Sequence, residues 1–207
     1  MRKRQNKKKD KTTLLFILIG LSLFLILVIK IYFDFIIDKN PNKEISSLNT
    51  YGYTLVKSDT KLYKDTYKEL ENVLKENNID YKKYATLISK LFIIDVFNLE
   101  NKITSTDIGG LEFIHKDLRN NFKENLGQTL YSYIESDLNA NREQKLPEVT
   151  LIETTNIFET KYVYNDIEYE SYMIDLSWKY KENLGYQDKI KLTLIKENNK
   201  LFIVKGE

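Results

Sequence analysis

A long apolar stretch near the N-terminus is the feature that most constrains this 207-residue chain. Between Thr13 and Ile29 there is no charged residue, and only Thr13, Gly20 and Ser22 are not large and apolar. As a helix this stretch would extend about 26 Å, and with the IYFDFII sequence that follows Lys30 it covers a hydrocarbon core of about 30 Å. The sequence therefore predicts a transmembrane helix over residues 12–37.

The flanking charges predict the orientation of this helix. Residues 1–11 form a basic tail with seven Lys or Arg residues, whereas Lys30, Lys39 and Lys43 are the basic residues that follow closely. The positive-inside rule then leaves the N-terminus in the cytoplasm and exports the chain beyond about residue 38. The stretch is longer than the roughly 7–15-residue apolar region of a cleaved signal peptide, so a single-pass, uncleaved anchor in the cell membrane is expected.

Composition argues against several classes of protein. The chain contains no cysteine, so it offers neither a disulfide framework nor a thiolate metal site. Residues 31–207 hold 24 basic and 29 acidic residues, and this part therefore lacks the broad positive surface of a nucleic-acid-binding protein. We expect the basic tail to contact the lipid bilayer, and we expect no nucleic-acid partner.

Residues 38–57 have no sustained periodicity and contain Pro41 among several Asn, Ser and Gly residues, which predicts a linker. The rest of the chain, residues 58–207, is expected to form one α+β domain outside the membrane. Its helical half, residues 58–146, begins with a helix that Ser58 or Asp59 caps.

Two long helices and a short one are expected in the rest of this half. Asp80 can cap a second helix that runs to about residue 99 and contains the very apolar sequence LFIIDVFNL, so it should be the most buried helix. Residues 100–110 predict a turn, followed by a short helix and then by a longer helix over residues 117–139. Gly127 lies inside that longer helix, where glycine costs up to about 1 kcal/mol relative to alanine, and we therefore expect a close packing contact there.

Residues 147–207 form the sheet half, because the apolar period changes from helical spacing to alternation after Pro147. Strands are expected over residues 149–158 and 160–181, with Asn165–Asp166 as a two-residue turn. The apolar phase flips near Ser171, which predicts a β-bulge there.

This order of elements predicts an α+β fold with three to four helices packed on a curved antiparallel sheet. It resembles the cone-shaped (cystatin-like) domain of the nuclear-transport-factor-two-like proteins. With the basic tail and the anchor, residues 8–207 resemble the bitopic assembly component of type IV secretion and conjugation machines. The resemblance is one of architecture and transfers no functional residue. It implies a non-enzymatic scaffold that contacts membrane-associated proteins and self-associates.

Two residues suggest chemistry but leave alternatives open. His115 is the single histidine and lies near Glu112 and Asp117, so it could be a general base or an ordinary helix-end residue. Asp95 interrupts the most apolar helix. A buried carboxylate would have a raised pKa, yet an ion pair with a Lys or a hydrogen bond from a Tyr hydroxyl is the favoured interpretation.

Other motifs favour structural roles. The STDIGG sequence lacks the GKS/T ending of a phosphate loop and is more typical of a tight turn. Asp166, Glu168 and Glu170 alternate along a strand and indicate a solvated face, not a cation site. We accordingly expect no catalytic residue, no metal site and no cofactor.

The leading functional hypothesis is a membrane-anchored binding or scaffold domain in a conjugation or secretion complex. The alternative is a ligand-binding or enzymatic domain with a pocket between the helices and the sheet. The residues expected to line that pocket are Phe92, Asp95, Tyr172, Ile174 and Trp178.

Overall fold

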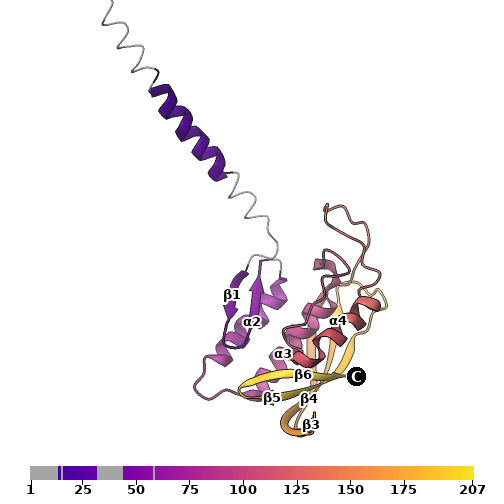
Figure 1. The fold of residues 1–207 in the computed structure, drawn as a ribbon. Coiled ribbons are helices and arrows are strands. Elements are labelled where there is room, and N and C mark those ends of the chain that lie inside the picture. The colour runs from indigo at the N-terminus through magenta and orange to yellow at the C-terminus, as the bar shows by residue number, and fades with distance from the viewer. Residues whose placement is uncertain (1–13, 15, 32–43, 58) are drawn as a thin grey trace, which may run out of the picture. The chain divides into compact units, whose positions relative to one another are not determined.

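The computed structural model describes residues 14, 16–31, 44–57 and 59–207, which fall into two units, Met1–Lys43 and Glu44–Glu207. In the first unit, residues 16–31 form a helix (Figure 1). Its large apolar side chains are exposed. The basic tail and both ends of the predicted transmembrane helix lie outside the described residues. Within the described ranges, no helix combines the length and the apolar content needed to cross a bilayer.

The second unit has the expected α+β composition. Its elements are, in chain order, β1 (Glu44–Leu48), β2 (Tyr53–Val56), α2 (Lys61–Leu74), α3 (Tyr81–Phe97), the 3-10 helices η1 (Leu99–Asn101) and η2 (Lys116–Leu118), α4 (Arg119–Gln128), β3 (Val149–Tyr164), β4 (Ile167–Tyr180), β5 (Lys189–Glu197) and β6 (Lys200–Gly206).

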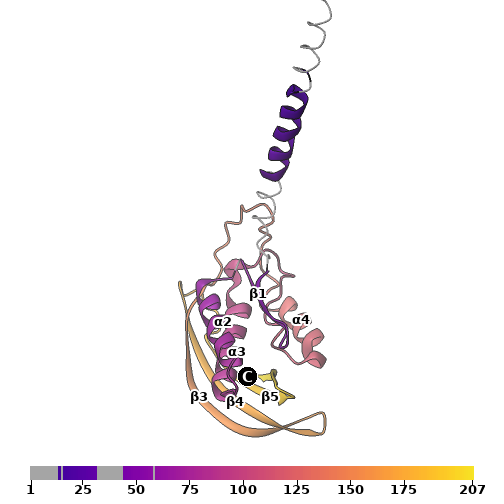
Figure 2. The ribbon, with the colours of Figure 1, turned by 90° about the vertical axis from the view of Figure 1, so that its left-hand side faces the viewer.

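Strands β3 to β6 form an antiparallel sheet in the order β3-β4-β5-β6. β3 and β4 make one long, curved ribbon (Figure 2). Asn165 and Asp166 connect them with positive φ angles of 49° and 61°, the conformation of a two-residue type I′ turn. This turn confirms the prediction, although β3 is one strand where the sequence suggested a break near residue 159.

The predicted bulge at Ser171 is wrong. The register of β4 is regular through Ser171 against both of its neighbours, and the two register shifts lie in β3, at residues 149–151 and 154–156. β5 pairs with β4 only from Ser171 onward, so in the described part of the chain residues 167–170 of β4 pair with β3 alone. Ile167 is 54% exposed there. The change of apolar phase thus marks the end of the core, not an inserted residue.

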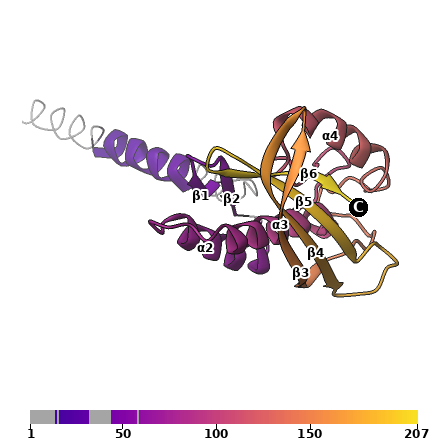
Figure 3. The ribbon, with the colours of Figure 1, turned by 90° about the horizontal axis from the view of Figure 1, so that it is seen from below.

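Helix α3 lies between α2 and the sheet (Figures 1 and 3) and contacts β3, β4 and β6. It is buried on nearly all sides, as its apolar sequence predicted. Asp80 caps it, accepting a hydrogen bond from Lys83 N at 3.0 Å. Trp178 packs against Phe97 with ring centroids 4.6 Å apart and contributes to the core between helix and sheet.

Helix α2 begins differently from the prediction. Its N-cap is Thr60, whose Oγ1 accepts a hydrogen bond from Tyr63 N at 3.2 Å. The carboxylate of Asp59 instead accepts a hydrogen bond from Val56 N at 2.7 Å, so it joins the end of β2 to the helix entry. Ser58 lies outside the described residues.

The predicted linker is wrong over residues 44–57, because β1 and β2 form an antiparallel hairpin. Tyr53 of β2 is fully buried, and its hydroxyl lies 2.7 Å from the hydroxyl of Tyr84 on α3. Tyr67 of α2 donates a hydrogen bond to the carbonyl of Tyr53 at 3.1 Å. The hairpin is therefore part of the folded unit. Residues 38–43 lie outside the described part of the chain.

The helix expected over residues 117–139 is much shorter. α4 ends at Gln128, and the next segment, to residue 148, is irregular, with Tyr133 82% and Leu138 75% exposed. Tyr131 accounts for the ending, because its hydroxyl donates to Val96 O at 2.8 Å and its fully buried ring requires the chain to leave the helix. A Cβ atom on Gly127 would meet nothing within 4 Å, so the expected close contact is absent.

Candidate functional site

An apolar pocket of about 270 Å³ opens between α3, α4 and the last two strands. Among the described residues that line it, only Gln187 and Lys205 have polar side chains. The apolar lining consists of Phe92, Val96, Phe97, Ile114, Leu118, Phe122, Leu126, Ile190, Leu192, Ile203 and Val204, together with Gly206.

Helical spacing builds one wall of this pocket. Leu118, Phe122 and Leu126 follow one another at intervals of four residues, so they lie on one face of α4 and its entry. The ring of Phe122 lies 5.7 Å from that of Phe92 on α3. These α4 side chains are only partly buried, so the pocket is open and its apolar surface is incompletely covered.

The only charged side chain of this lining lies near the C-terminal end of the chain. Lys205 forms an ion pair with Glu207 at 2.7 Å, and both side chains are about half exposed. The apolar pocket therefore has no buried charged group that could act on a bound molecule.

A second cavity, also of about 270 Å³, is lined by both polar and apolar residues and meets an adjoining face of α3; we call it the polar cavity because it holds four ionisable groups. Its side chains come from β2, the entry and first turn of α2, α3 and the loop after Ile108. The ionisable groups in this polar cavity are Asp59, Tyr63, Asp95 and Glu112.

Asp95 is held by two partners. Its Oδ1 accepts a hydrogen bond from Lys102 Nζ at 2.8 Å, and its Oδ2 accepts one from Gly110 N at 2.6 Å. Burial has the largest single effect on the pKa of Lys102 and lowers it, but attraction to Asp95, Tyr131 and Asp107 and the hydrogen bond to Asp95 together raise the net pKa. The predicted pairing of Asp95 with a lysine is thereby confirmed.

The two adjacent glycines of the STDIGG sequence bring this loop onto α3. A Cβ atom on Gly109 would lie 2.1 Å from the carbonyl oxygen of Asp95. Gly110 has φ of +79°, and a Cβ there would lie 2.6 Å from Val96 Cγ2. Only glycine allows this approach, which gives Asp95 a backbone donor. The tight turn is confirmed, and the glycines serve α3 packing.

Glu112 connects three elements. Its Oε2 accepts hydrogen bonds from Thr54 N at 3.2 Å and Thr54 Oγ1 at 3.1 Å, and its Oε1 accepts one from Tyr63 Oη at 3.2 Å. Burial and the nearby charge of Asp95 raise the pKa of Glu112 to about 7, although the three donors act in the opposite direction. The carboxyl therefore titrates near neutral pH.

Asp59 behaves similarly. Burial raises its pKa to about 6, against the lowering effect of the Val56 N–H, and the charge of Asp95 adds to the rise. Even so, no group of three or more His, Cys, Asp or Glu side chains in the described ranges could hold a metal ion. The carboxyls of the polar cavity are directed to protein donors and connect β2, α2 and α3.

His115 lines neither of these two cavities. It is 3% exposed and lies between two carboxylates, with Nδ1 3.6 Å from Asp117 Oδ2 and Nε2 3.5 Å from Glu197 Oε2. Its ring also meets Tyr164 and Phe202 edge-on. His115 is also the N-cap of η2, because its Nδ1 accepts a hydrogen bond from Asp117 N at 3.4 Å, so the helix-end interpretation is confirmed. The residue connects η2, β5, β6 and the tip of the ribbon.

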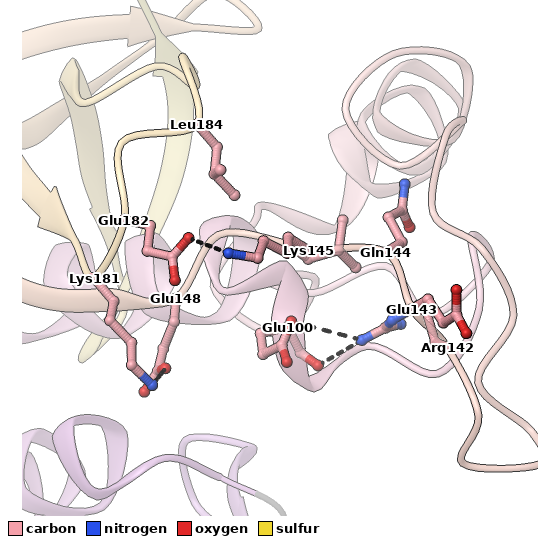
Figure 4. A pocket seen from close by; sticks show the side chains of 10 residues that line it. Glu100, Arg142, Glu143, Gln144, Lys145, Glu148, Lys181, Glu182 and Leu184 are labelled. Atoms are coloured by element: carbon pink, nitrogen blue, oxygen red, sulfur yellow. Dashed lines mark hydrogen bonds and ion pairs between the residues drawn. The ribbon is translucent and has the colours of Figure 1, made fainter.

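A third, charged crevice of about 250 Å³ lies beside the irregular segment (Figure 4). Arg142 donates hydrogen bonds to Lys102 O at 2.7 Å and to Glu100 O at 2.8 Å. Ion pairs join Lys145 to Glu182 and Lys181 to Glu148. These contacts hold the irregular segment against η1 and against the loop that follows β4.

The five residues predicted to share a pocket do not. Phe92 lines the apolar pocket and Asp95 lines the polar cavity, whereas Tyr172, Ile174 and Trp178 belong to the core. The spacing of Phe122 and Leu126 predicted that they share one face of a helix, but it did not predict that this face lines a pocket. Asp59 was predicted only as a helix cap and Glu112 only as a neighbour of His115, and neither position indicated the polar cavity.

The predicted acidic face is confirmed, since Asp166, Glu168 and Glu170 are exposed.

Comparison with known proteins gives no match to a family model, a curated protein or a solved structure.

Proposed function

We propose that the chain is a single-pass membrane protein whose α+β unit lies outside the membrane and works by binding a protein partner. The uncharged sequence from Thr13 to Ile29, the exposed apolar side chains of the helix over residues 16–31 and the basic tail support an anchor with a cytoplasmic N-terminus. The proposed setting is a conjugation or secretion complex, which the order of the elements supports.

The observation that carries this proposal is the apolar pocket. Its volume of about 270 Å³ lies just below the roughly 300–1,000 Å³ typical of small-molecule sites. It suits one large apolar side chain of a protein partner, the kind of anchor residue that dominates binding energy at protein interfaces. Exposed charged residues on α4, such as Lys123 and Glu124, would supply the polar rim of such an interface.

Indole, an analogue of the tryptophan side chain, tests the pocket directly. The full chain in lipid nanodiscs, with labelled Ile and Leu methyl groups, should show shifts of the Ile190, Leu192 and Ile203 signals on titration. The methyl signals of Ile88, which is buried elsewhere in the core, serve as the internal control.

Leu126→Trp, which places an indole in the pocket from α4, should reduce the response to added indole at least about tenfold. Pocket signals that do not move, or a variant that responds like the unmodified chain, would show that the pocket does not accept such a side chain.

The proposed orientation in the membrane has a separate test. Protease added to intact protoplasts should remove a tag at the C-terminus and spare a tag at the N-terminus. The reverse pattern would overturn the orientation and leave the pocket experiment unaffected.

The alternative function, a ligand-binding or enzymatic domain, is favoured by the polar cavity, because shifted pKa values near neutrality cluster at functional sites. Glu112 and Asp59 are the groups concerned. Under the binding proposal, a folded Glu112→Gln or His115→Ala chain keeps its activity in the cell. Loss of activity with the partners still bound would favour the alternative.

A further inference from the structure

The sheet has one covered edge and one free edge. The edge of β6 is covered by the segment before η2, since Ile203 N donates to Phe113 O at 2.9 Å and His115 N donates to Ile203 O at 3.1 Å. β3 is the other edge strand, and in the part of the chain that the structure describes it pairs with β4 alone. It has 16 residues and follows the outer border of the sheet (Figure 2).

The outer half of β3 carries exposed apolar side chains. Phe158 is 55% and Val163 63% exposed, and both lie on the ribbon beyond the second register shift. A long edge strand with unpaired backbone groups and apolar side chains is a template for pairing with another chain. The question is which chain the sequence of this edge fits.

Residues 156–164, NIFETKYVY, are complementary to themselves when two copies run antiparallel about Thr160. Glu159 then faces Lys161 of the second copy, Phe158 faces Tyr162, and Ile157 faces Val163. Opposite charges, aromatic rings and aliphatic side chains thus meet in matched pairs, each of them twice. Such directly opposed cross-strand pairs are the interactions that stabilise antiparallel sheets.

The backbone is directed suitably for this pairing. A two-residue loop closes on a hydrogen-bonded pair of residues, which here is Tyr164 with Ile167. Because backbone groups point alternately to the two sides of a strand, the N–H and C=O groups of residues 157, 159, 161 and 163 face the free edge. Residues 159 and 161 would form hydrogen-bonded pairs across the axis, and Thr160 would face Thr160 of the second copy.

Among the described residues, the two charged side chains near the axis leave this edge open. Glu159 pairs with Lys82 of α3 at 3.3 Å, but both side chains remain more than half exposed. Lys161 pairs with Glu168 across the ribbon at 2.6 Å and is 71% exposed. Both charges can therefore take a second partner without being taken out of an interior.

We infer that β3 is a self-association edge, where two copies of this chain join antiparallel about Thr160 into one continuous eight-stranded sheet. The arrangement has two-fold symmetry, in which the same patch serves both copies. An anchor in a shared membrane would raise the encounter rate of two such edges. This inference concerns a different surface from the apolar pocket, so either can fail alone.

Charge exchange tests the pairing. In the full chain in detergent, measured by sedimentation equilibrium, Glu159→Lys and Lys161→Glu should each weaken the dimer by at least about tenfold, because each places like charges opposite one another twice. The double variant restores opposite charges across the axis and should return within about threefold of the unmodified chain.

If Glu159 and Lys161 acted only through their ion pairs within one chain, the double variant would give the opposite result. The exchanged charges would then face Lys82 and Glu168, which have the same sign, and the losses caused by the two single changes would add. A double variant as weak as the single variants, or an unmodified chain that stays monomeric at all concentrations, would overturn the inference.

Disulfide formation in native membranes gives an independent readout. The chain has no cysteine of its own. Thr160→Cys places two thiols in a pair with Cα atoms about 4.5 Å apart, within disulfide range, and should form a covalent dimer on mild oxidation. Thr155→Cys, also an exposed threonine of β3, is the control, since two copies of residue 155 would be about 34 Å apart. Equal cross-linking at both positions, or none at 160, would contradict the inference.

Discussion

The two cavities that meet α3 are alike in size, but they differ in whether their lining side chains have partners within the protein. In the polar cavity, the carboxyls of Asp59, Asp95 and Glu112 accept hydrogen bonds from protein donors. In the apolar pocket, the side chains of Phe122 and Leu126 remain partly uncovered. The first arrangement holds segments of the chain together, whereas the second leaves apolar surface that a partner can cover. Changes to the polar cavity should therefore cost stability, and changes to the apolar pocket should mainly alter binding.

The largest effect is expected at the Gly109–Gly110 loop, which packs on α3 beside the polar cavity. Gly109→Ala would place a methyl group against the Asp95 backbone, and we expect it to lower the free energy of unfolding by about 4 kcal/mol. Gly127→Ala is the matched control, because its site in α4 is open and alanine favours the helix by up to about 1 kcal/mol. Denaturant titration followed by Trp178 fluorescence measures both. Similar effects at the two glycines would mean that the loop does not press on α3.

The next largest effect should follow from breaking the ion pair of the polar cavity. Lys102→Met leaves the Asp95 carboxylate without its cation, at a cost of about 3 kcal/mol. Asp95→Asn combined with Lys102→Met removes both charges and should recover part of this loss. A double variant less stable than Lys102→Met alone would show that the charges do not act as a pair.

Between about pH 4.5 and 7, the pH dependence of stability should come mainly from Glu112 and Asp59 of the polar cavity. The pKa of Glu112 is raised to about 7 by burial, so the folded chain holds this proton more tightly than the unfolded chain does. Stability is therefore greatest at mildly acid pH and falls by about 2 kcal/mol as pH rises from about 4.5 to above 7, after allowance for partial exposure. Asp59, with a pKa of about 6, adds a smaller fall of the same sign.

Glu112→Gln keeps an acceptor for Thr54 and removes the titration. Thermal unfolding of both chains across this pH range should show a flatter profile for the variant. Parallel profiles would assign the dependence to other groups.

The smallest effect on stability is expected in the apolar pocket. Leu126→Trp should change the free energy of unfolding by less than about 1 kcal/mol, because the added ring enters space that is already open. The same denaturant titration applies, with Gly109→Ala as the reference for a site without space. A loss as large as that of Gly109→Ala would mean that the pocket is closed in solution.

Local signals predicted the elements that are stabilised locally. The Asp80 cap, the Asn165–Asp166 turn and the buried character of α3 all follow from a few neighbouring residues. The hairpin over residues 44–56 did not, because Tyr53 is buried by Tyr84 and Tyr67, which are distant in the sequence. α4 is short for a related reason, since Tyr131 makes its contacts with α3 and with the loop at Gly109.

The candidate site likewise contains one residue that local sequence indicated and another that depends on distant segments. Asp95 was recognised as a charge in an apolar helix, and its pairing with a lysine could be anticipated. Glu112 could not, because its three donors come from residues about fifty positions away and its raised pKa depends on their packing.

By itself the sequence determined the apolar stretch over residues 13–29, the α+β composition, the hairpin turn and the face of α4, because each depends on residue order within a few turns or one strand pair. Only the tertiary structure decided where the cavities lie, which carboxyls have pKa values near neutral pH and which sheet edge stays free. These properties depend on burial and on distances between segments far apart in the chain, and the free energies concerned arise when those segments meet.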